Sequence, residues 1–234
     1  TSGVHNPDRD GYRRTAGNAR LGYQIIPGQR IDATLLASDM NSGYDASGSA
    51  LRDDRNLNRL RTAGLTWSGR WTDAYSTRVS VTDTSSRYET TPSAYITETK
   101  LRGYLWQNEF RVGAHLATAT LERREDGLTN PAVGSTTVAL DRSRSQDALA
   151  LGYGYSAGGH TLQANVRHDS DSEFGGKGTG SVAYGYAFTP QWRVTASAGT
   201  AFRAPTLYQR FSQYGDASLR PETGRNIELG LRYA

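Results

Sequence analysis

The residues best suited to chemistry lie in a polar stretch between residues 40 and 58. Tyr44 and Asp45 stand near its beginning, and Asp53 and Asp54 follow after a run rich in Gly and Ser. Calcium takes about six to eight oxygen ligands, and flexible loops rich in Asp can converge on it. The stretch is therefore a candidate calcium loop. It is equally consistent with a solvated acidic loop whose carboxylates pair with the arginines Arg52, Arg55 and Arg59.

A second acidic run covers residues 169–173 and reads Asp-Ser-Asp-Ser-Glu. In the register of an EF-hand, Phe174 would stand at the position that requires Gly, and Gly180 would stand at the position that requires Glu. The run therefore does not predict an EF-hand. We predict a turn held by hydrogen bonds from Asp side chains to the backbone.

Patterns for catalysis and for nucleic-acid binding are missing from the sequence. The histidines are scattered, no G-x-S-x-G elbow is present, and the glycine-rich run 176–180 lacks the spacing of a phosphate-binding loop. The pI is about 9.4, but Arg and Asp are interspersed without a basic stripe. We predict a protein that is not an enzyme and has no nucleic-acid partner.

The composition limits the kinds of structure that this chain can form. Hydrophobic residues make up 36% of the 234, no Cys is present, and no apolar run approaches the ~18 residues of a membrane-spanning helix. Disulfides and thiolate metal sites are thereby excluded. Aromatic residues reach 10%, with 14 Tyr, which argues against disorder.

Large apolar residues alternate with small or polar ones, as neighbouring side chains of a β-strand do. Val182, Tyr184, Tyr186 and Phe188 illustrate this pattern within residues 178–188. We predict eleven strands and no helix, with two less regular strands within residues 100–121. The other runs are 18–25, 31–37, 63–67, 75–81, 149–155, 161–167, 192–202 and 227–233.

Short and long connections alternate along the chain. The predicted short turns lie at 27–29, 71–73, 112–113, 158–159 and 189–191. The predicted long polar loops cover 39–59, 86–97, 124–144, 169–177 and 203–226. An up-and-down antiparallel sheet places all short turns at one edge and all long loops at the other.

A soluble β-sandwich and a transmembrane β-barrel both fit an antiparallel sheet, and three features favour the barrel. The polar faces carry charged residues in mid-strand, as a wet lumen tolerates: Arg20, Arg78, Arg167 and Glu228. Aromatic residues stand near strand ends, at Trp71, Tyr75, Phe188, Trp192 and Phe202. The loops are long on one side only. We predict an all-β, antiparallel, up-and-down transmembrane β-barrel.

Eleven antiparallel strands do not close evenly, and an open edge in lipid leaves backbone groups unpaired. We therefore expect residues 1–234 to be one partial barrel domain belonging to a larger barrel.

Three motifs resemble TonB-dependent outer-membrane receptors. Residues 199–209 read GTAFRAPTLYQ, residues 219–222 read LRPE, and residues 227–233 read IELGLRY. Residues 167–175, RHDSDSEFG, resemble the loop that precedes the first of these motifs in the family. The resemblance implies a middle section of a 22-stranded barrel in the outer membrane of a Gram-negative bacterium, without its plug domain, its TonB-contacting N-terminal region or its terminal strands.

Within the family, the order of elements and the pairs Tyr44-Asp45 and Asp53-Asp54 are most similar to cobalamin transporters. This resemblance implies uptake of cobalamin or a related corrinoid, powered through TonB, with calcium bound by Tyr44, Asp45 and Asp53 or Asp54. It also implies ligand contacts at Thr97, and the long loop 203–226 offers Arg203, Tyr208 and Tyr214 to a bulky ligand.

Other functions stay open at this point. They are a siderophore or haem receptor, a passive porin, and a structural β-protein whose loops bind a partner. The net charge of +4 favours anionic ligands or the phosphates of lipopolysaccharide, although basic residues at a membrane rim also serve only to hold lipid head groups.

Overall fold

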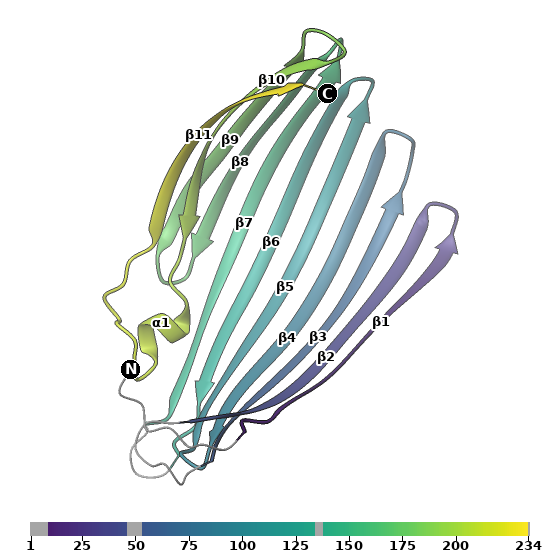
Figure 1. Cartoon of the computed structure of the whole chain (residues 1–234). Helices are drawn as coiled ribbons and strands as arrows, with labels where there is room; N and C mark the ends of the chain where they lie inside the picture. Colours follow the sequence, from purple (N-terminus) through teal and green to yellow (C-terminus); the bar gives the residue numbers. More distant parts are fainter. Residues whose placement is uncertain (1–8, 46–52, 134–137, 234) are drawn as a thin grey trace.

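The computed structural model describes residues 9–45, 53–133 and 138–233. They form one antiparallel sheet of eleven strands, in which each strand pairs with its neighbours in the sequence (Figure 1). The strands are β1 (Tyr12–Ile26), β2 (Gln29–Tyr44), β3 (Asp54–Arg70), β4 (Tyr75–Thr91), β5 (Tyr95–Val112), β6 (His115–Asn130), β7 (Leu140–Ala157), β8 (His160–Asp171), β9 (Gly175–Ala187), β10 (Trp192–Arg203) and β11 (Glu222–Tyr233). This confirms the predicted up-and-down order.

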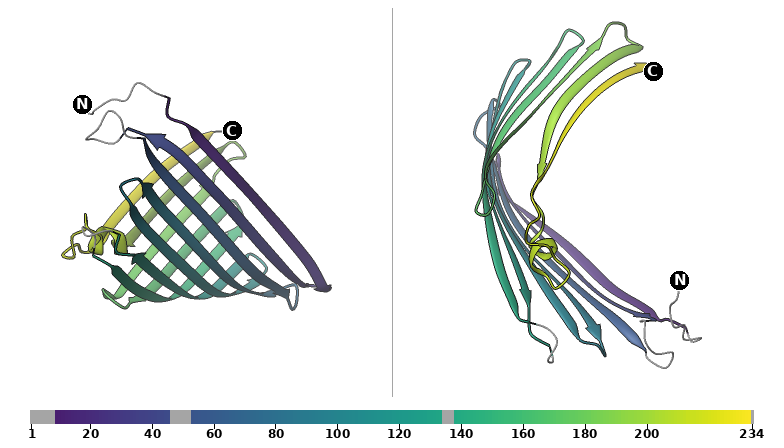
Figure 2. Two further views of the ribbon diagram at one scale, coloured as in Figure 1. Left: turned by 90° about the horizontal axis from the view of Figure 1, so that it is seen from below. Right: turned by 90° about the vertical axis from the view of Figure 1, so that its left-hand side faces the viewer.

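The sheet is bent into an open trough, as the two views of Figure 2 show. Strands β1 and β11 are its edges. The described residues contain no second sheet that could cover the convex face, so the sandwich alternative is wrong. Large apolar side chains remain exposed there, among them Leu35, Leu65, Leu151 and Ile227.

The predicted short turns are confirmed, and all five lie at one end of the trough. Glycines permit the tightest of them. Gly28 and Gly159 adopt φ of 83° and 80°, and a Cβ on either would approach the carbonyl oxygen of Arg70 or Ala187 to 2.7 or 2.8 Å. Only Gly adopts this backbone conformation without strain.

The predicted long loops are mostly strand, which corrects the sequence analysis. Strands β2 to β7 run 16 to 18 residues and extend far into the stretches predicted as loops. Thr97, for example, lies within β5. A strand that projects beyond a membrane meets water on both faces, so its sequence loses the apolar alternation that marks a strand.

A short helix, α1 (Leu207–Phe211), was not predicted. Thr206 caps it through a hydrogen bond from the backbone N–H of Gln209, whose side-chain oxygen accepts from the Thr206 N–H at 2.8 Å. The signal was therefore present as a T-x-x-Q capping box. Among the described residues, α1 is the single helix, and its five residues cannot cross a membrane.

The two faces of the sheet differ in chemistry. The pairing register places Arg20, Arg78, Arg167 and Glu228 on the concave face, as predicted for a wet lumen. Only three apolar residues in the described part are buried: Leu128, Ala148 and Leu207. Leu128 and Leu207 lie where α1 packs on the concave side of β6 and β7. The apolar surface of this sheet therefore faces outward.

Most aromatic side chains gather at the short-turn end. Tyr75 stacks on Phe110 with ring centroids 4.4 Å apart, and Trp192 contacts Phe188 and Tyr233. Of the five predicted end aromatics, Phe202 alone lies near the opposite end of its strand. A girdle of aromatic side chains at this level is typical of the membrane–water interface of a barrel.

Candidate functional site

Hydrogen bonds and ring contacts join a group of aromatic and polar residues on the concave face at the long-loop end. Thr97 donates to the Oδ1 of Asn130 at 2.7 Å, and the Nδ2 of Asn130 donates to the Tyr95 hydroxyl at 2.9 Å. The Tyr95 hydroxyl donates to that of Tyr208 at 3.3 Å. The rings of Tyr88 and Tyr214 each lie 6.4 Å from that of Tyr95, centroid to centroid. We call these six residues the tyrosine cluster.

The tyrosine cluster lies beyond the membrane-spanning part of the strands. Strand β5 has 18 residues, whereas a tilted strand crosses the hydrocarbon layer with about 9–11. Tyr95 is its first residue, at the end remote from the short turns. Burial, followed by the hydrogen bond with Tyr208, raises the pKa of the Tyr95 hydroxyl above its ordinary value. The phenol is thus held neutral and able to donate a hydrogen bond.

A buried arginine attaches the α1 segment to the sheet. Arg144 donates to the Asp126 carboxylate at 2.6 Å and to the carbonyl oxygen of Pro205 at 2.7 Å. Its Nε also lies 3.7 Å from the Oδ2 of the fully buried Asp171 side chain. Burying a charged group away from water is costly unless the group is paired and hydrogen-bonded in this way. Because Pro205 directly precedes α1, Arg144 fixes the position from which Tyr208 reaches Tyr95.

A second arginine holds the far side of the same segment. Arg210 donates to Glu173 at 2.7 Å and to the carbonyl oxygen of Ala217 at 2.9 Å. Its guanidinium also lies over the rings of Phe174 and Phe211, at 4.9 and 4.7 Å from their centroids. The β8–β9 turn and the α1 segment therefore form one unit beside the tyrosine cluster.

The β8–β9 turn has the predicted hydrogen bonds. The Oδ1 of Asp171 accepts from the backbone N–H groups of Glu173 and Phe174 at 2.8 and 3.2 Å. The acidic run 169–173 thus forms an Asx-type turn.

Three of the four predicted ligand-contact residues meet in the tyrosine cluster: Thr97, Tyr208 and Tyr214. Arg203 stands apart, exposed at the end of β10 and opposite Glu222 in the register, with no recorded contact to the cluster in the described residues. Tyr88, Tyr95 and Asn130 were not predicted. The signal for Tyr95 was its position two residues before Thr97, which places both on one face of a strand.

The predicted calcium residues border one hairpin end. Tyr44 and Asp54 are direct partners across β2 and β3, and Asp45 and Asp53 continue from them. The intervening residues 46–52 lie outside the described residues. Within the described ranges, no three acidic or His side chains are grouped as a metal ion requires. These four residues do not by themselves make a complete site, and calcium binding stays a prediction.

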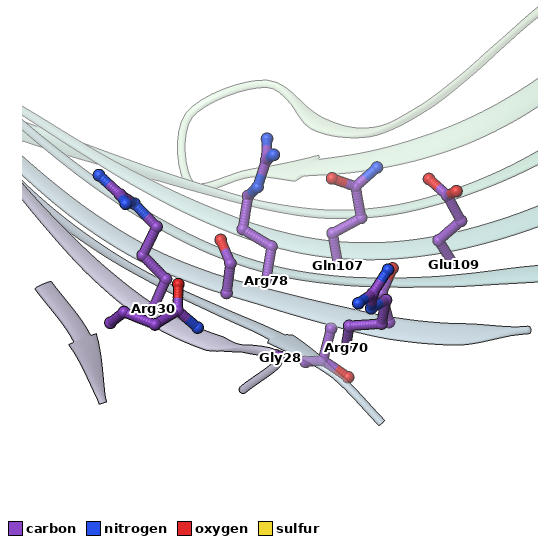
Figure 3. A pocket seen from close by; sticks show the side chains of 11 residues that line it. Gly28, Arg30, Arg70, Arg78, Gln107 and Glu109 are labelled. Atoms are coloured by element: carbon purple, nitrogen blue, oxygen red, sulfur yellow. The ribbon is translucent and has the colours of Figure 1, made fainter. Parts of the chain in front are cut away.

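A polar pocket of about 520 Å³ lies on the concave face near the short turns. Arg30, Arg78, Gln107 and Glu109 project from the sheet into this space (Figure 3). Guanidinium and amide groups of this kind bind carboxylates and water. The concave face therefore carries polar side chains both near the short turns and at the tyrosine cluster.

The sequence of this chain is similar to a protein family and to a curated relative. Residues 2–234 match the family model described as TonB dependent receptor-like, beta-barrel. A 71-residue stretch is 42% identical to the vitamin B12 transporter BtuB of Vibrio cholerae serotype O1. It covers 30% of this chain and 12% of that protein.

Solved structures share the fold over nearly the whole chain. The ferric enterobactin receptor PfeA of Pseudomonas aeruginosa aligns with a TM-score of 0.86 and 18% identity, covering 100% of this chain and 42% of that one. The siderophore receptor PirA of Pseudomonas aeruginosa gives 0.81 and 20% identity, over 96% and 44%. The alcaligin receptor FauA of Bordetella pertussis gives 0.78 and 15% identity, over 95% and 41%.

The chain thus spans less than half the length of these receptors, and their likeness concerns the fold. Neither the family nor these neighbours are enzymes, as the sequence analysis predicted. From the match over residues 2–234, the chain belongs to the TonB-dependent receptor β-barrel family.

Proposed function

We propose that this chain forms part of the barrel wall of an outer-membrane receptor that takes up cobalamin or a related corrinoid, with energy supplied through TonB. The observation that carries the ligand assignment is the 42% identity over 71 residues to a vitamin B12 transporter. The family and the outward apolar face of the sheet support an outer-membrane location.

The tyrosine cluster supports a bulky ligand at the long-loop end. Tyr214 is 78% exposed, and Tyr88, Tyr95 and Tyr208 present rings and hydroxyls on the concave face. Rigid aromatic rings supply large contact areas at small entropic cost, and their hydroxyls orient polar groups of a ligand. A corrinoid has both a broad planar ring and amide side chains, so it matches this combination.

A ferric siderophore is the second candidate. It is favoured by the solved structures, because the receptors PfeA and PirA, which cover 100% and 96% of this chain, are named as receptors for siderophores. Their identities of 13–20% carry the fold but not the ligand. Cobalamin therefore comes first, on the more closely related sequence.

Equilibrium binding to the full-length protein tests the assignment. Cyanocobalamin and a ferric catecholate siderophore are titrated separately, each with calcium and with a chelator. We expect cyanocobalamin to saturate the receptor at or below micromolar concentration. Saturation by the ferric siderophore, with no binding of cyanocobalamin, would replace the corrinoid with the second candidate.

A further inference from the structure

The tyrosine cluster contains a chain of hydrogen bonds that runs in one direction. Thr97 donates to the Oδ1 of Asn130 at 2.7 Å, and the Nδ2 of Asn130 donates to the Tyr95 hydroxyl at 2.9 Å. Tyr95 in turn donates to the Tyr208 hydroxyl at 3.3 Å. A hydroxyl has one hydrogen to donate and two lone pairs that accept. The hydroxyl hydrogens of Thr97 and Tyr95 are therefore both used within the chain.

The last hydroxyl of this chain belongs to Tyr208. Tyr208 accepts the hydrogen of Tyr95, and among the residues that the structure describes, no recorded hydrogen bond uses the hydroxyl hydrogen of Tyr208 itself. The Tyr208 residue is half-buried. A hydrogen-bonding group that is withdrawn from water and left without a partner costs free energy. An acceptor atom of a ligand that reaches this point can therefore take the free hydrogen.

Two features support this direction of the chain. Asn130 is only 7% exposed, and its Oδ1 and Nδ2 have different partners, so reversal of the chain requires the side-chain amide to turn over. Burial raises the pKa of the Tyr95 hydroxyl, so Tyr95 keeps the hydrogen that it donates to Tyr208. The free hydrogen thus lies at the Tyr208 end of the chain.

Tyr208 is held in position by the start of its own helix. The Thr206 hydroxyl accepts from the backbone N–H of Gln209 at 3.1 Å, and the Gln209 side chain accepts from the backbone N–H of Thr206 at 2.8 Å. The buried Arg144 donates to the carbonyl oxygen of Pro205 at 2.7 Å. A donor that is already oriented loses little conformational freedom when a ligand binds.

An arginine beside α1 favours the same kind of ligand atom. The Arg142 guanidinium lies 5.4 Å from the ring centroid of Phe211, which belongs to the same helix as Tyr208. Arg142 is exposed, and its recorded hydrogen bond goes to the carbonyl oxygen of Asp141. In the described part of the chain, no acidic side chain is recorded as its partner. A guanidinium has donors and no acceptor, so it too binds carbonyl, carboxylate or phosphate oxygens.

We propose that Tyr208 is a specificity-determining residue, which donates its hydroxyl hydrogen to an acceptor oxygen of the transported ligand. A corrinoid carries amide side chains around its ring, and their carbonyl oxygens are acceptors of this kind. A ligand that places an oxygen here completes the chain of hydrogen bonds, whereas a ligand without one leaves the Tyr208 hydrogen unpaired. The proposal rests on the transport function proposed above and names the kind of ligand atom that the tyrosine cluster recognises.

Three substitutions of Tyr208 separate the donor from the ring in the full-length protein. Tyr208→Phe keeps the ring without the hydroxyl, and Tyr208→p-aminophenylalanine restores a donor at the same place. Tyr208→O-methyltyrosine keeps the oxygen that accepts from Tyr95 but has no hydrogen to donate. In equilibrium titrations with cyanocobalamin, we expect about fivefold weaker binding for the first and third variants, and affinity within about twofold of the wild type for the second.

Resistance to urea in micelles, measured on the same proteins, distinguishes recognition of the ligand from a merely structural role. We expect Tyr208→O-methyltyrosine to unfold as the wild type does, because Tyr95 keeps its acceptor, while its affinity falls. Tyr23→Phe, on the convex face, is the control and should change neither quantity. Three results would each overturn the proposal: wild-type affinity in Tyr208→Phe, binding kept by O-methyltyrosine but lost by p-aminophenylalanine, or affinity that falls only together with urea resistance.

The choice of ligand distinguishes failure of this proposal from failure of the proposed function. If cyanocobalamin does not bind to the wild type, the corrinoid assignment is wrong. The same variants are then titrated with a ferric catecholate siderophore, whose oxygens are also acceptors. The same order of affinities would support Tyr208 as a donor to that ligand. Any other order, or no binding of either ligand, would overturn the donor role as well.

Discussion

The tall and the short parts of the sheet have different tasks. Strands β2 to β7 have 16 to 18 residues, whereas β8 to β11 have 12 or 13. Both parts have aromatic side chains near the short turns and an apolar band on the convex face. Only the tall part continues beyond the band. It carries ion pairs on its convex face, such as Arg61 with Asp39, and the residues of the tyrosine cluster that belong to strands on its concave face.

The short part differs in the segment that connects β10 to β11. Where β10 ends at Arg203, the chain turns inward and forms α1, which contacts β6 and β7 of the tall part and buries Leu207. Figure 2 shows this segment on the concave side of the trough. The membrane fixes the apolar length of every strand, while the extra length of β5 and β6 and the inward turn after β10 together place the tyrosine cluster.

The largest effect is expected from cutting the attachment between the two parts. Arg144→Ala leaves the buried Asp171 without its cation and leaves Asp126 with only the exposed Arg124, and breaking such a buried pair typically costs about 3–5 kcal/mol. We expect lower resistance to urea in micelles and faster protease cleavage within residues 204–219. Arg124→Ala is the matched control, because the 54% exposed Arg124 side chain pairs with the same Asp126 and should cost about 0–1 kcal/mol. Equal effects of both variants would contradict the role of Arg144.

A smaller effect is expected within the tyrosine cluster. Tyr95→Phe removes the hydroxyl that links Asn130 to Tyr208, a loss of about 1 kcal/mol per hydrogen bond. We expect several-fold weaker binding of the transported ligand in equilibrium titrations. Tyr23→Phe, on the exposed convex face, should bind the ligand as the wild type does. An unchanged affinity in Tyr95→Phe would place the ligand elsewhere on the tall part.

Alkaline pH should weaken the same cluster in a defined direction. The raised pKa of Tyr95 means that folding favours the neutral phenol. Its contribution is therefore complete below the ordinary Tyr pKa of about 10 and is lost as pH rises from there toward the higher folded value. We expect unfolding measurements to show wild-type stability approaching that of Tyr95→Phe above about pH 10. A difference between the two proteins that stays constant across this range would count against the shift.

The smallest effect is expected at the rim of the tall part. If calcium orders the β2–β3 hairpin, Asp53→Asn weakens its binding, and a chelator lowers ligand affinity in the wild type more than in the variant. Asp73→Asn, in a short turn at the other end, is the control for charge. Calorimetry with calcium alone measures the binding directly. No heat of binding to the wild type would remove the calcium prediction.

The sequence was informative wherever the two faces of a strand meet different solvents. The alternation around Val182 and Tyr184 appears because one face is apolar and the other wet, so eleven strands and five short turns could be predicted. The same signal failed at Thr97 and across most of the predicted long loops, because both faces of those extensions are wet. The helix Leu207–Phe211 was missed because five residues are too few to show a helical period, so that only the T-x-x-Q capping box marked it.

The strand order and the two faces could be predicted from the amino-acid sequence, because local alternation reports which side of the sheet meets water, and short motifs indicated the family. Which residues contact one another depends on the tertiary structure. Thr97 and Asn130 come together through the pairing of β5 with β6, and Tyr208 joins them through the inward turn after Arg203. The outward ion pairs of Arg61 with Asp39, Arg102 with Asp83 and Arg123 with Asp147 likewise depend on the strand register, which hydrogen bonding between strands sets and which no single strand encodes.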